Sequence, residues 1–264
     1  MKKTINALIP LLLLFSPSMN TRAQERKLLC QLVENHAYSE LTNDRKNPYD
    51  NGYSEQRYDY VLDTFIDEFS PDTGNQLNIQ RDWTDGAVNA WAWRIGQEYW
   101  LEVPGGMSRY HLISEEGFIS TLCHELGHLL GGSPHSHEIS YEGQADYYGH
   151  MKCLERIFKR LNLDRSDSSE LSCAGEFCQA RLEGAKSLSS YYASLENSPF
   201  PSLITPDQSQ VTTTLRSHPK AQCRFDTMVA AMKCPNRNPF SYLEPHSGSC
   251  QEEVSQRPKC WYSF

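Results

Sequence analysis

Apolar side chains recur every three or four residues between positions 54 and 69, which is the spacing of one face of an α-helix. The apolar positions are Tyr58, Val61, Leu62, Phe65 and Phe69. Ser54 precedes them and can accept a hydrogen bond from the first turn as an N-cap residue. We therefore expect an amphipathic helix over this stretch.

Three short segments with strand-like patterns follow within residues 77–103, and brief turn sequences (Thr-Asp-Gly, Gly-Gln and Pro-Gly-Gly) end them. This arrangement predicts a small antiparallel sheet with short turns. In the middle segment Ala90 and Ala92 face one way, while Trp91 and Trp93 face the other. We expect at least one of these tryptophans to pack in the core.

Helical patterns dominate the next part of the chain. Ser114, followed by two acidic residues, predicts the start of a helix that ends at Gly131. Further helices are expected over 140–163 and 177–196. Because the strands and the helices occupy separate stretches, the pattern indicates an α+β fold.

The first 23 residues have the pattern of a secretory signal peptide. Lys2 and Lys3 precede a short apolar run, and Ala23 ends a cleavage-site-like sequence. The run is much shorter than the roughly 20 apolar residues that span a bilayer. The remaining 24–264 is expected to form a single domain with its core over about 54–232.

Cleavage after Ala23 would remove three basic residues and no acid, changing the formal net charge from −8 to −11. So acidic a chain is a poor partner for nucleic acid or for an anionic membrane surface. We expect an exported protein, periplasmic or extracellular, without stable membrane insertion.

Nine cysteines are typical of an exported protein rather than of a cytosolic one. Cys123 lies within an apolar run and is expected to be a buried free thiol. The other eight can form four disulfides that tie down the loop-rich second half, including the tail over 234–264. They are Cys30, Cys153, Cys173, Cys178, Cys223, Cys234, Cys250 and Cys260. A zinc ribbon is not expected, because the chain has no Cys-x-x-Cys pair.

His124, Glu125 and His128 form the pattern His-Glu-x-x-His within the helix that follows Ser114. Residues four apart share one helix face, so both imidazoles can bind one divalent ion, for which zinc is the usual choice. Glu125 lies beside them as the general base for a water molecule.

Glu142 is the expected third ligand, because it lies near the start of the next helix and a carboxylate there completes a three-ligand zinc site. Asp146, four residues later on the same face, is expected to accept a hydrogen bond from a ligand histidine. His135 and His137 are expected to be solvated loop residues, and His150 a packing residue.

A different third ligand would define another class of zinc peptidase. The metzincin pattern has a glycine three residues after the second histidine, and Gly131 occupies that position. It also requires a histidine where Pro134 stands, and His135 misses that position by one residue. A metzincin would further need a methionine turn, for which Met228 or Met232 is available.

Several motifs together resemble the HtpX heat-shock protease and CAAX prenyl endopeptidase family of gluzincin metallopeptidases. His-Glu-x-x-His is followed by Glu-x-x-Ala-Asp at 142–146. Residues 89–107 are similar to the family's Asn-Ala edge-strand hairpin. The sequence Ser-His-Pro around His218, with Arg224 six residues later, is similar to another family motif. These signals occur in the family's order within 77–232.

The resemblance implies a zincin-like fold and a Zn²⁺-dependent endopeptidase that uses a zinc-activated water. It implies that His218 stabilises the oxyanion and that Arg224 holds its loop or the edge strand. It also implies that an extended peptide or unfolded protein adds to the edge strand, through Asn89, Ala90, Trp91, Ala92 and Trp93. The chain departs from the family by having no membrane helix after residue 23 and by its cysteine-rich tail.

A non-catalytic, zinc-stabilised protein-binding module is the alternative from another functional class. Glu125 argues against it, because a purely structural zinc site needs no base and has four protein ligands.

Overall fold

The computed structural model describes residues 37–41, 50–234, 250 and 252–263, all within one compact unit that spans 32–264. The signal peptide expected over 1–23 and Cys30 lie outside the described residues. Among the described helices, none is long and apolar enough to cross a bilayer.

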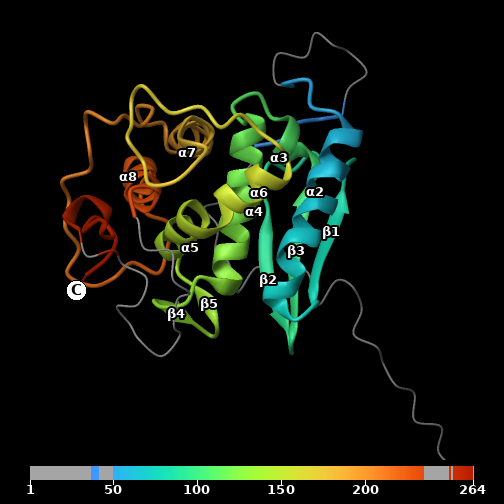
Figure 1. Cartoon of the computed structure of the whole chain (residues 1–264), viewed down its shortest axis with the longest axis horizontal. Coiled ribbons are helices and arrows are strands. Elements are labelled where there is room, and N and C mark those ends of the chain that lie inside the picture. Colours follow the sequence, from blue (N-terminus) through green and yellow to red (C-terminus); the bar gives the residue numbers. More distant parts are fainter. Residues whose placement is uncertain (1–36, 42–49, 235–249, 251, 264) are drawn as a thin grey trace, which may run out of the picture. The chain divides into compact units, whose positions relative to one another are not determined.

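The structure is α+β with small sheets (Figure 1). The longer helices are α2 (Glu55–Phe69), α4 (Glu115–Leu130), α7 (Cys178–Glu196) and α8 (Ala221–Met232). The shorter ones are α3 (Gly105–Arg109), α5 (Glu142–Tyr148), α6 (Leu154–Arg160), the π-helical turn η2 (Gly149–Cys153) and the 3-10 turns η1 (Ser70–Thr73) and η3 (Glu253–Ser255). The strands are β1 (Leu77–Asp82), β2 (Trp91–Ile95), β3 (Glu98–Pro104), β4 (His135–Ser136) and β5 (Ile139–Ser140).

The serine caps are confirmed. The Ser54 side chain accepts a hydrogen bond from the backbone N–H of Arg57, and Ser114 accepts one from Gly117. Helix α2 buries the predicted stripe of apolar residues, Tyr58, Val61, Leu62, Phe65 and Phe69. The expected helix over 140–163 is present as α5, η2 and α6 in succession.

The main sheet differs from the antiparallel prediction. Its strand order is β1-β3-β2, with β1 parallel to β3 and β2 antiparallel to β3. The connection over 83–90 is long enough to carry the chain past the position of β3, so β1 and β2 do not pair as a hairpin. Strand β2 therefore lies at an edge of this sheet.

The tryptophans of β2 do not enter the core, so that expectation was wrong. Ala90 and Ala92 are buried, whereas Trp91 and Trp93 are half-buried on the other face. Trp93 stacks on Trp100 of β3 with ring centroids 6.0 Å apart.

Helix α4 is the centre of the fold. It contacts β2 and β3 on one side and α5, η2 and α7 on the other (Figure 1). This explains why nearly the whole of α4 is buried. The surrounding elements therefore hold α4 in position, and with it the side chains that face α5.

Four disulfides join described residues: Cys123–Cys153, Cys173–Cys178, Cys223–Cys260 and Cys234–Cys250. The expectation of a free thiol at Cys123 was wrong, because η2 packs on α4 and brings Cys153 to it. The disulfides indicate folding in an oxidising compartment outside the cytosol.

Candidate metal centre

Two histidines on α4 face a common point. His124 and His128 are both buried, and their Nε2 atoms are 3.1 Å apart. Their Nδ1 atoms are engaged elsewhere, at 2.8 Å from Asp146 Oδ1 and at 2.8 Å from the carbonyl oxygen of Ser140. A carbonyl only accepts, so His128 carries its proton on Nδ1, and both rings can direct Nε2 lone pairs at one ion.

Glu142, the first residue of α5, completes a triangle of three potential ligand side chains, with one carboxylate oxygen near each imidazole. Its Oε2 is 3.2 Å from His124 Nε2, and its Oε1 is 3.5 Å from His128 Nε2. The same Oε2 is buried without a hydrogen-bond partner of good geometry. Imidazole nitrogens of His124 and His218 lie 3.2 and 3.0 Å from this oxygen, and a cation held between the histidines would balance its buried negative charge.

Close packing of α4 and α5 makes this triangle possible. A Cβ on Gly127 would lie 2.5 Å from the carbonyl oxygen of Ala145, so only glycine allows this approach. The Gln144 side chain donates a 2.7 Å hydrogen bond to the Gly131 carbonyl at the end of α4. The position of Glu142 relative to the histidines is thus determined by backbone contact.

Glu125 borders the same point. His124, Glu125 and His128 each have a potential ligand atom within 4.8 Å of those of the other two, so this cluster could bind a metal ion. Glu142 has shorter contacts to the imidazoles, which favours Glu142 as ligand and leaves Glu125 beside the ion. Glu125 is buried, and its Oε2 also has no hydrogen-bond partner.

The two glutamates have opposite electrostatic environments. Burial raises the pKa of Glu125. Burial would also raise the pKa of Glu142, but its electrostatic interactions and hydrogen bonds with the neighbouring histidines outweigh this effect and lower the pKa well below its usual value. Glu142 is thus suited to remain ionised as a ligand, and Glu125 to exchange a proton.

Asp146 and Arg224 form a buried, bidentate ion pair beside His124. Arg224 Nε and Nη2 lie 2.7 and 2.8 Å from the two carboxylate oxygens. Burial alone would raise the pKa of Asp146, but the Arg224 charge holds it below its usual range. The Arg224 guanidinium thus secures the carboxylate that orients His124, and the expected role of Arg224 in holding its loop or the edge strand stays a prediction.

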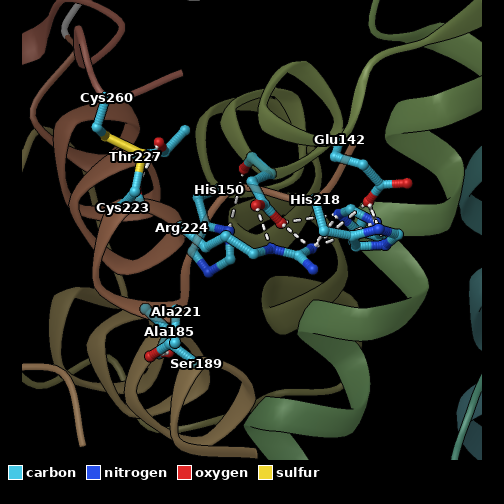
Figure 2. Close-up of polar contacts among 12 residues, drawn as sticks. Glu142, His150, Ala185, Ser189, His218, Ala221, Cys223, Arg224, Thr227 and Cys260 are labelled. Carbon is cyan, nitrogen blue, oxygen red and sulfur yellow. Dashed lines mark hydrogen bonds and ion pairs between the residues drawn. A yellow bond between two sulfur atoms is a disulfide. The ribbon is translucent and has the colours of Figure 1, made fainter. Parts of the chain in front are cut away.

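His218 reaches the cluster from the segment before α8. Its Nε2 is 3.0 Å from Glu142 Oε2, and the two side chains point toward one another in Figure 2. The segments that carry Glu142 and His218 are 76 residues apart in sequence, so only the Ser-His-Pro motif signalled this proximity.

The alternative histidine is not the solvated loop residue that was expected. His135 is half-buried in β4, where it pairs with Ser140, whereas His137 is exposed. Met228 and Met232, considered for a methionine turn, are both buried within helix α8 rather than in a turn.

Strand β2 and the residues just before it lie beside α4. Asn89 is half-buried just before β2, and β2 contacts α4. Arg94 of β2 donates a hydrogen bond to the Leu129 carbonyl, one residue after His128. The strand and the histidine pair are therefore neighbours.

Two contributions escaped the sequence reasoning. The centroid of the Tyr192 ring, on α7, lies 3.8 Å from the Arg224 guanidinium carbon. Tyr192 belongs to no sequence motif that would have indicated this contact. The Trp261 ring packs so closely on Gly143 that a Cβ there would lie 2.2 Å from it. The Cys223–Cys260 disulfide, next to both Arg224 and Trp261, joins α8 to this C-terminal segment.

Comparisons with family profiles, with curated proteins and with solved structures gave no significant match. The interpretation of the site therefore depends on its own geometry.

Proposed function

We propose that this chain is an exported zinc-dependent endopeptidase of the gluzincin type, related to the HtpX and CAAX prenyl endopeptidase family. The observation that carries the proposal is the triangle of His124, His128 and Glu142 atoms next to the buried Glu125 carboxylate. A binding site alone would need the triangle but would have no use for Glu125.

The dimensions of the triangle suit zinc. Tetrahedral ligands at about 2.0–2.1 Å from zinc are roughly 3.3–3.4 Å apart. Here the two Nε2 atoms are 3.1 Å apart, and they lie 3.2 and 3.5 Å from the two different oxygens of the Glu142 carboxylate. Two neutral imidazoles and one carboxylate also form a donor set that catalytic zinc uses, with one position open. Zinc bound there supplies Lewis acidity, which acidifies water and polarises a carbonyl group.

The protein's own groups would handle the protons. Glu125 takes a proton on Oε2 from the attacking water and delivers it to the leaving amine, a role that its raised pKa favours. His218 stabilises the oxyanion by donating from Nε2. Asp146 keeps the His124 ring oriented, and Arg224 keeps Asp146 ionised.

The substrate would be an extended peptide or an unfolded protein. Strand β2 lies at the end of the strand order of the main sheet, and a peptide added beside it would gain backbone hydrogen bonds. The flanking residues Asn89, Trp91 and Trp93 would contact its side chains. With the disulfides and the signal peptide expected over 1–23, the proposed location is the periplasm or the extracellular space.

Cleavage of casein by the mature protein tests the activity. Glu125→Gln, with its zinc content verified, is the matched control, because it retains the ligands and loses the base. Activity that disappears in the zinc-loaded variant supports the proposal. If both proteins bind zinc and neither cleaves casein or a peptide library, the non-catalytic binding module is the better interpretation.

Zinc content tests the ligand set separately. Glu142→Ala should abolish stoichiometric zinc binding, and His135→Ala should leave it intact. The opposite result would support the metzincin alternative.

A further inference from the structure

Arg216 lies beside the candidate metal centre, and its side chain is exposed to solvent. Its guanidinium carbon is 5.8 Å from the centroid of the Tyr141 ring, and Tyr141 immediately precedes Glu142. Two residues after Arg216, His218 places its Nε2 3.0 Å from Glu142 Oε2 (Figure 2). Arg216 is therefore linked to the site twice, through the ring that it contacts and through its own stretch of chain.

The backbone before Arg216 is held by the C-terminal segment. The Leu215 N–H donates a 2.8 Å hydrogen bond to the Trp261 carbonyl. The Thr214 hydroxyl accepts a hydrogen bond of 3.1 Å from the Ser263 N–H. The guanidinium therefore extends from a fixed point at the border of the site.

No carboxylate in the described part of the chain forms an ion pair with Arg216. Every other arginine in that part donates a hydrogen bond or forms an ion pair. An arginine over an aromatic ring retains its N–H donors, and these form a fork that matches the two oxygens of a carboxylate. Arg216 is thus equipped to bind an anionic group that comes from another molecule.

The charge of the whole chain acts in the opposite direction. The formal net charge is −8, so the protein as a whole attracts basic peptides and repels acidic ones. At physiological ionic strength, exposed charges more than about 8 Å apart are largely screened from one another. Selection of an acidic peptide therefore requires a cation close to the cleaved bond, and Arg216 meets this requirement.

We propose that Arg216 binds a carboxylate of the substrate, so that the site selects peptides with an acidic group within three residues of the cleaved bond. The proposal rests on the proposed peptidase function. An extended peptide advances about 3.3 Å per residue, and the two residues from Arg216 to His218 span at most about 7 Å. Acidic side chains and the terminal carboxylate of a short peptide share the group that arginine binds through two parallel hydrogen bonds.

Paired peptides test this selectivity. A casein peptide that the mature protein cleaves is remade with Glu, Gln or Lys at each of three positions on either side of the cleaved bond. At one of these positions or more, kcat/KM should be about fivefold higher with Glu than with Gln, and lowest with Lys. The Glu-to-Gln ratio should fall to about one in Arg216→Gln and stay above one in Arg216→Lys. Arg216→Glu should prefer Lys.

Lys159→Gln is the matched control, because it removes one positive charge from an exposed position on α6, which packs on α2. It should keep the wild-type ratio. Repeating the series with amidated C-termini distinguishes the two sources of the carboxylate. A preference that survives amidation identifies the acidic side chain, and one that disappears identifies the terminal carboxylate. Equal kcat/KM for Glu and Gln at every position and with either end, or a preference that Arg216→Gln retains, would overturn the proposal.

Binding distinguishes failure of this proposal from failure of the peptidase function. Zinc-loaded Glu125→Gln protein is titrated with fluorescently labelled casein peptides that carry Glu or Gln at one position. The wild type could cleave nothing while the Glu peptides bind about fivefold more tightly and the added Arg216→Gln change removes that difference. In that case the peptidase function fails and the carboxylate site stands. Casein cleavage that shows no dependence on Arg216 gives the reverse, and equal binding without cleavage contradicts both.

Discussion

Asp146→Asn tests whether the buried ion pair maintains both the fold and the metal site. The carboxylate is fully buried, accepts two short hydrogen bonds from Arg224 and a third from His124. An asparagine keeps the shape but removes the charge, so the Arg224 guanidinium becomes a buried cation without its principal counterion. Breaking such a pair costs about 3–5 kcal/mol.

That cost is large against the roughly 5–15 kcal/mol that stabilises a typical domain. For a protein of this size it corresponds to a fall in Tm of about 6–20 °C. The variant should therefore fold but melt early. It should also bind zinc about 10–100-fold more weakly, as expected when the partner of a ligand histidine is removed.

The assay combines thermal unfolding of the metal-free protein with competition for zinc by a chromophoric chelator. Asp63→Asn is the matched control, because Asp63 pairs with Arg81 while its side chain is 66% exposed. Such a surface pair contributes roughly 0–1 kcal/mol. Adding Arg224→Met to Asp146→Asn should restore part of the stability and none of the zinc affinity. The reasoning is refuted if Asp146→Asn destabilises the protein no more than Asp63→Asn does.

Four further predictions concern the neighbourhood of the site. Burial would lower the pKa of His124, but the neighbouring Asp146 carboxylate raises it to about 10. Zinc must therefore displace a proton from His124. Its affinity, measured by chelator competition, should rise about tenfold per pH unit from 7 to 9. The same shift stabilises the metal-free protein below about pH 6.5, and this contribution should be lost toward pH 10 in urea titrations. Trp261→Ala should cost about 3–5 kcal/mol of unfolding free energy and weaken zinc binding, because the ring supports α5; unaltered zinc affinity would contradict this. Replacing both Cys123 and Cys153 with alanine should cost roughly 3–4 kcal/mol in the same titrations, since their 30-residue separation closes a long loop.

The local parts of the fold were predictable from sequence, because they depend on neighbouring residues. The caps at Ser54 and Ser114 and the helix α7 follow from hydrogen-bonding side chains and apolar spacing within a few positions. Helix α8 was missed, since Lys220 at its N-cap makes no side-chain hydrogen bond and the stretch before it reads as a loop.

Features that depend on distant packing were not predictable in the same way. The parallel pairing of β1 with β3 is set by the path of residues 83–90. The Cys123 partner became apparent only once η2 was seen against α4. The histidine pair and Glu142 could be proposed from helical spacing, whereas the contacts of His218 and Arg224 depend on chain segments 76 or more residues away.

The support of α5 by Trp261 bears on when the metal centre can form during synthesis. Every group of the cluster, from His124 to Arg224, leaves the ribosome before Cys260 and Trp261 do. At about 5–20 residues per second, the interval between Glu142 and Trp261 is roughly 6–24 seconds. The Cys223–Cys260 disulfide also requires an oxidising compartment. The chain would consequently complete its candidate metal centre only after synthesis and oxidation, and under the proposed peptidase function this order of events would protect the proteins of the cell that makes it.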